Sequence, residues 1–171
     1  LHLDVDVLPR DTPLRVILQQ PLRDARFRAV LIFTGWWNFA VNFAAPFFAV
    51  YMLRDLGLSM LWVIGLSVSS QLMNVLFFRL WGGIADRFSN KSVLVFACPM
   101  FIFGFLIWPF TAMPDKYVLT IPLLIAIHVM AGISTAGVTL CTGNLAFKFA
   151  PYGKATAYLA VNALVSGVMA T

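Results

Sequence analysis

Long uncharged stretches divide the chain into apolar spans separated by short charged segments. Five stretches, residues 29–53, 56–78, 92–114, 117–147 and 155–171, contain no Asp, Glu, Lys or Arg, and together they hold 119 residues. An apolar run of about 20 residues crosses the ~30 Å hydrocarbon core of a bilayer as an α-helix. The pattern predicts an all-α, polytopic membrane helix bundle with five transmembrane helices, at about 29–53, 57–80, 92–113, 118–147 and 155–171.

Composition agrees with the pattern and excludes other classes of protein. Of the 171 residues, 61% are hydrophobic and 11% are charged, whereas soluble domains are about 45–50% apolar and about 25% charged. A soluble domain, a disordered chain and a disulfide-framed secreted module are therefore excluded. A signal peptide accounts for one apolar segment and not for five in succession. Cys98 and Cys141 fall inside apolar spans, where we interpret them as small packing residues.

The basic residues predict the orientation in the membrane. Five Arg precede the first span, three basic residues follow the second and two follow the fourth. If all five spans cross, these ten lie on one side, and only Arg54 and Lys116 lie on the other. Cytoplasmic loops carry the excess of Lys and Arg, so the residue 1 end is expected in the cytoplasm. The net charge of +5 thus reflects topology, and we expect no nucleic-acid partner.

Residues 1–28 form a polar head or linker that precedes the first span. It is punctuated by Pro9, Pro13 and Pro21. Apolar and basic residues alternate over residues 14–28, which is compatible with a short helix lying in the membrane interface. A loosely ordered cytoplasmic linker is the alternative, and the sequence leaves both open.

A specific motif lies between the second and third spans, where residues 79–92 read RLWGGIADRFSNKS. The segment resembles the G-x-x-x-D-R/K-x-G-R/K-R/K loop of the major facilitator superfamily. Gly82, Asp86, Arg87 and Lys91 occupy the matching positions. Ser89 departs from the glycine that the family prefers, and Asn90 departs from its basic residue. An ordinary charged turn that orients two helices is the alternative reading.

We assign physical roles to the motif residues. Gly82, with its neighbour Gly83, is expected to allow close helix contact. Asp86 is expected to meet the positive end of a helix dipole. Arg87 and Lys91 are expected to hold the loop in the cytoplasm. The resemblance implies that the loop is a conformational latch between the two halves of a carrier, a role that Asp86 would inherit.

The resemblance also implies a longer polypeptide, because the superfamily has two six-helix halves. The five spans match the first five helices of either half. Three features favour the second half: the chain begins without Met, its long polar head suits a central linker, and its motif is incomplete. The sequence leaves both assignments open.

Polar residues recur at helical spacing in four of the spans, as expected for helices around a central solute cavity. Amides and hydroxyls that join helices by hydrogen bonds are the alternative explanation for each of them. The candidates for the cavity wall are Asn38, Asn42, Gln71, Asn74, His128, Thr135 and Asn162. Small residues, among them Gly132 and Gly137, mark faces on which helices can pack closely.

His128 is the candidate for proton coupling, since its pKa lies near physiological pH in water. A neutral, hydrogen-bonded histidine is the alternative. No Asp or Glu lies inside a span, so a coupling carboxylate would have to come from further helices. The sequence contains no metal, nucleotide or catalytic constellation, and we expect no cofactor.

The function implied is secondary active or facilitative transport of a small solute by alternating access, without enzymatic activity. The expected partners are that solute, the lipid bilayer and the missing helices of the same polypeptide. The expected location is the membrane, most simply a bacterial inner membrane. A membrane-embedded enzyme or a receptor-like helical scaffold is the alternative.

Overall fold

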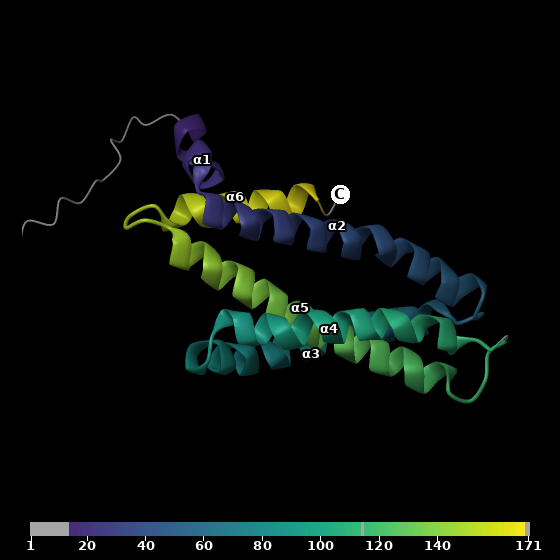
Figure 1. The fold of residues 1–171 in the computed structure, drawn as a ribbon. Coiled ribbons are helices and arrows are strands. Elements are labelled where there is room, and N and C mark those ends of the chain that lie inside the picture. The colour runs from purple at the N-terminus through teal and green to yellow at the C-terminus, as the bar shows by residue number, and fades with distance from the viewer. Residues whose placement is uncertain (1–13, 114, 170–171) are drawn as a thin grey trace, which may run out of the picture. The chain divides into compact units, whose positions relative to one another are not determined.

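The computed structural model describes residues 14–113 and 115–169, and the side chains of residues 19–113 and 115–169. All regular elements in this part of the chain are helices, which confirms the predicted all-α class. They are α1 (Leu14–Arg23), α2 (Ala25–Arg54), α3 (Met60–Arg87), α4 (Asn90–Ile107), the 3-10 helix η1 (Trp108–Thr111), α5 (Thr120–Phe149) and α6 (Ala155–Val168) (Figure 1).

Four helical segments are long and apolar enough to cross a membrane: α2, α3, α4 with η1, and α5. At about 1.5 Å per residue, the 30 residues of α2 extend about 45 Å, which exceeds a ~30 Å hydrocarbon core. Helix α6 has 14 described residues and is apolar but shorter than a span. The expected fifth span over residues 155–171 therefore stays a prediction, and residues 170 and 171 lie outside the described part.

The helices extend beyond the uncharged stretches at several ends. Helix α2 begins at Ala25, inside the expected head, and α3 continues to Arg87. Charged side chains in a terminal turn can reach the interface while the backbone stays helical. Helix α1 occupies part of the expected head as a helix, and its position relative to a membrane stays a prediction. Pro9 and Pro13 lie outside the described residues.

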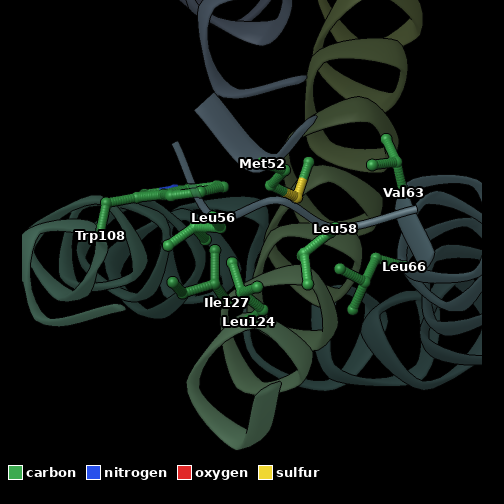
Figure 2. Packing of buried hydrophobic residues seen from close by; sticks show 8 residues of the cluster. All are labelled: Met52, Leu56, Leu58, Val63, Leu66, Trp108, Leu124 and Ile127. Atoms are coloured by element: carbon green, nitrogen blue, oxygen red, sulfur yellow. The ribbon is translucent and has the colours of Figure 1, made fainter. Parts of the chain in front are cut away.

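The described chain forms two compact units, and each is described by itself. One unit contains residues 45–141, with the end of α2, all of α3, α4 and η1, and most of α5. In it, Met52, Leu56 and Leu58 pack with side chains of α3, η1 and α5 (Figure 2). Trp108 stacks on Phe48 with ring centroids 4.1 Å apart. This apolar cluster joins four segments at one end of the unit.

A second contact in the same unit joins α5 to α3 and α4. The indole Nε1 of Trp81 donates a 2.9 Å hydrogen bond to the carbonyl oxygen of Ile133. A Cβ added at Gly132 would overlap the carbonyl oxygen of Ser70 on α3. One added at Gly137 would come within 3.0 Å of the Ala97 Cβ on α4. Close packing expected at small residues of the fourth span is thus found at both glycines.

The other unit contains the start of α2, the end of α5 and helix α6. The carboxylate of Asp24 caps α2, because Oδ1 accepts hydrogen bonds from the backbone N–H groups of Arg26 (2.9 Å) and Phe27 (3.3 Å). Its Oδ2 accepts a 3.4 Å hydrogen bond from the hydroxyl of Tyr158. The rings of Phe27 and Tyr158 lie 4.6 Å apart. This contact fixes α6 beside the first turns of α2 (Figure 1).

Candidate functional site

The motif segment forms a tight turn between α3 and α4. Helix α3 ends at Arg87 and α4 begins at Asn90. Ser89 has an extended backbone conformation, and its hydroxyl accepts a 3.1 Å hydrogen bond from the backbone N–H of Ser92. A serine oxygen in this position satisfies one of the free N–H groups at a helix start. The departure from the family's glycine therefore has a local reason, which is the capping of α4.

The charged groups of the motif lie on the surface of this unit. Asp86, Arg87 and Lys91 are exposed, and the Arg87 guanidinium lies 5.5 Å from the centre of the Phe88 ring. The Asp86 carboxylate makes no hydrogen bond or ion pair with residues 19–113 or 115–169. Ser89 caps the adjacent helix. The helix N-terminus expected to meet Asp86 is thus not that of α4.

The close helix contact expected at Gly82 stays a prediction, because the described residues supply no partner surface for it. A Cβ added at Gly82 or Gly83 meets no atom of the described residues within 4 Å. The tight glycine contacts of this unit instead lie on α5, at Gly132 and Gly137. A glycine in the sequence does not show whether a neighbouring helix packs against it, because that depends on the opposing surface.

Three cavity candidates lie in the unit that contains the start of α2. The side-chain amide of Asn38 donates to the carbonyl oxygen of Thr34 (2.8 Å), and that of Asn42 donates to the carbonyl oxygen of Asn38 (2.8 Å). These amides bond within their own helix, so neither joins two helices through its N–H group. On α6, the buried Oδ1 of Asn162 has no hydrogen-bond partner among the described residues.

Thr34 is a further candidate, which the sequence pattern did not single out. Its side chain is 3% exposed, and its Oγ1 has no hydrogen-bond partner within the described part of the chain. Its position one helical turn before Asn38 was the available signal. Buried polar atoms usually have a partner, and the Ser134 Oγ on α5 also has none among the described residues.

The other four candidates lie in the unit of residues 45–141. Gln71 is exposed on α3, while Asn74 on α3 and Thr135 on α5 are half-buried. His128 is half-buried on α5, where its Nδ1 lies 2.8 Å from the carbonyl oxygen of Leu124. Its ring centroid lies 6.1 Å from that of Trp108. Contact with that carbonyl places a proton on Nδ1, so His128 is held in one orientation by its own helix.

A network of hydroxyl groups joins α2, η1 and α5 within the unit of residues 45–141. The sequence pattern did not predict this network. The Tyr51 hydroxyl lies 3.1 Å from Oγ1 of Thr111, which donates to the Trp108 carbonyl oxygen (2.7 Å). The hydroxyl of Thr120 donates to the carbonyl oxygen of Thr111 at 2.7 Å. Thr111 and Thr120 are fully buried. These bonds fix the loop before α5, and we see in them a structural role.

Within the described part of the chain, no group of three His, Cys, Asp or Glu side chains is placed to hold a metal ion. The candidate site therefore consists of two parts: the charged turn at the α3–α4 junction, and polar side chains along the long helices. Neither arrangement has the nucleophile, base and orienting group of a catalytic constellation.

The comparison with known families gives one match. The family model described as Major Facilitator Superfamily matches residues 5–171. No curated protein and no solved structure matches the chain significantly. The match covers nearly the whole chain, including the α3–α4 turn and every candidate residue.

Proposed function

The chain belongs to the major facilitator superfamily, and from this premise we propose that it carries a small solute by alternating access, as a secondary active or facilitative transporter. It is an integral, multi-pass membrane protein of a family that moves small solutes across lipid bilayers. The observation that carries the proposal is the family match over residues 5–171, which includes the motif turn. No group of side chains in the described residues favours the alternative of an embedded enzyme or a receptor-like scaffold.

The proposed orientation places residue 1 and the α3–α4 turn in the cytoplasm, most simply of a bacterial inner membrane. The excess of Lys and Arg on the head and on the second and fourth loops supports it. The proposal predicts that Arg54 and Lys116 lie on the opposite side.

We assign Asp86 the role of a latch residue. It lies in the last turn of α3, where the negative end of the helix dipole disfavours a carboxylate. It has no compensating partner in the described structure. A positive helix N-terminus in a further part of the same polypeptide would supply that partner in one conformation and release it in another. Such a switched contact is what alternating access requires.

The incomplete motif is weaker support for assigning the five spans to the second six-helix half than the sequence alone suggested. Capping of α4 explains Ser89 by local geometry, and this reason applies equally to a first half. The polar head over residues 1–28 remains as support.

The solute site is proposed to lie among the polar side chains of the long helices. Thr34 and Asn162 support it most directly, because each holds a buried oxygen for which the described part of the chain supplies no hydrogen-bond partner. Asn38 and Asn42 direct their N–H groups to their own helix, which leaves amide oxygens to accept bonds from a solute. The chemistry favours a neutral, hydrogen-bonding solute, since the five apolar stretches offer amides and hydroxyls but no Asp, Glu, Lys or Arg to pair with an ion.

The experiment is uptake and efflux by the purified protein in proteoliposomes, with a panel of labelled solutes preselected by thermal stabilisation. We expect saturable movement of at least one solute, reduced by Asn162→Ala or Thr34→Val. Ser69→Ala is the matched control, because the Ser69 hydroxyl donates to its own helix at Leu66 (2.7 Å). If no solute moves under any gradient, the proposal fails.

A further inference from the structure

An apolar groove of about 480 Å³ runs along α2 on the unit that contains α1 and α6. Its floor is Gly35, where a Cβ would come within 3.4 Å of a Val165 methyl group. Ile32, Trp36 and Phe39 line it from α2, and each is exposed. Among the described residues, Arg28 is the one charged residue that lines it.

The stretch of α2 that lines the groove matches one leaflet of a bilayer in length. Arg28 and Phe39 are eleven positions apart on α2, which corresponds to about 16 Å along the helix axis. Half of a ~30 Å hydrocarbon core is about 15 Å. Because the uncharged part of α2 begins directly after Arg28, this residue lies at the membrane interface. The groove therefore extends from the headgroup region to about the bilayer centre.

The charges at the interfacial end favour an anion. Arg23, at the end of α1, and Arg26 and Arg28, in the first turn of α2, are all exposed. The only acidic residue among them is Asp24, whose carboxylate is occupied by the cap of α2 and by Tyr158. Arg28 forms no ion pair with the described residues. Each basic residue near an anionic lipid surface attracts it appreciably, and a guanidinium matches the geometry of a phosphate.

We propose that this groove binds an anionic phospholipid, with its phosphate on Arg28 and one acyl chain along Ile32, Trp36 and Phe39. The site is separate from the polar residues assigned to the solute. Its occupancy would hold the α1–α2 junction at the interface and cover the glycine floor between α2 and α6. A helix of the protein or a second copy of the chain in the groove would exclude the lipid, and the experiment distinguishes these occupants.

The test is photo-crosslinking of the protein in nanodiscs that contain phosphatidylglycerol with a diazirine on its acyl chain. The same experiment with phosphatidylcholine is the comparison, and adducts are located by mass spectrometry. We expect adducts on Trp36, Phe39 or Met169 and a clear excess with phosphatidylglycerol. Arg28→Gln should reduce that excess about fivefold, the factor that corresponds to ~1 kcal/mol for one basic group.

Lys148→Gln is the matched control, because Lys148 is an exposed basic residue in the last turn of α5, belongs to the same unit and does not line the groove. Arg28→Lys should restore part of the excess. Equal labelling by both lipids would overturn the proposal, since the acyl chains would then act as bulk solvent. Adducts on exposed Leu61 and Phe96 of the other unit, without any in the groove, would show that protein covers it and would also overturn the proposal.

Discussion

Gly132 shows how strongly a single side chain is constrained where two membrane helices meet. Its Cα hydrogen faces the backbone of α3, so a methyl group there would overlap the Ser70 carbonyl oxygen and lie 3.0 Å from the Met73 Cβ. Backbone atoms do not move aside as a flexible side chain does. In a bilayer, where apolar burial drives helix association weakly, such contacts supply much of the packing.

Gly132→Ala should therefore lower the free energy of unfolding by about 1–3 kcal/mol, the usual cost of overpacking. Gly82→Ala is the control, because an added Cβ there meets nothing within 4 Å and alanine favours the helix by ~1 kcal/mol. Denaturation in mixed micelles measures both. Equal stability of the two variants would contradict the α3–α5 contact.

Ser89 is a second residue at which one side chain has a local effect on stability, through the hydroxyl that caps α4. Ser89→Ala removes the hydrogen bond to the Ser92 N–H group and should lower stability by ~1 kcal/mol, whereas Ser89→Gly should lower it by only a few tenths. Thermal unfolding monitored by circular dichroism checks the order. If alanine and glycine are equivalent to serine, the hydroxyl does not cap α4.

At the scale of the elements, the uncharged stretches indicated where the long helices lie because hydrocarbon excludes charge. They did not indicate the helix ends. Arg26 and Arg28 lie inside α2, and Asp86 and Arg87 lie inside α3, because a helix continues into the interface after its charges begin. The break between α1 and α2 coincides with the Asp24 cap, and the pattern of apolar residues does not single out this carboxylate.

The candidate site was also predictable only in part from the sequence. The spacing of Gly82, Asp86, Arg87 and Lys91 identified the turn and the family. It did not show which glycines contact another helix, since that depends on the opposing surface. Helical periodicity selected Asn38 and Asn162 but not Thr34, because a threonine in an apolar span is common and only burial without a partner makes it notable.

The connections between the long helices carry a prediction about topology. Phe88 lies in the α3–α4 turn, and Asp55 follows α2. The variants Asp55→Cys and Phe88→Cys are made in a protein whose Cys98 and Cys141 are replaced by alanine. In intact cells that produce these proteins, a membrane-impermeant maleimide should label Asp55→Cys and not Phe88→Cys. Lysed cells should show labelling of both. Labelling of Phe88→Cys from outside would reverse the proposed orientation.

For the whole molecule, the latch role of Asp86 predicts a shift between conformations. Asp86→Asn removes the charge but keeps the shape, so a contact with a helix N-terminus should weaken by about 1 kcal/mol. Because the turn is proposed to lie in the cytoplasm, its contact would hold the protein closed on that side. The change corresponds to about a fivefold shift toward the state that is open to the cytoplasm. The labelling rate of a cysteine at Gly82, where a side chain has space, should rise accordingly.

Asp115→Asn is the matched control for that shift, because Asp115 is an exposed aspartate in the loop before α5, outside the motif. An unchanged labelling rate in Asp86→Asn, or an equal rise in Asp115→Asn, would show that the turn only orients two helices.

The account as a whole rests on the claim that the protein is a carrier. Solute counterflow in proteoliposomes tests this most directly, because a carrier exchanges a labelled solute against an unlabelled one without any other gradient. We predict transient accumulation of the labelled solute above equilibrium in vesicles preloaded with the solute that stabilises the protein. Labelled solute that only equilibrates, or does not enter, would contradict alternating access.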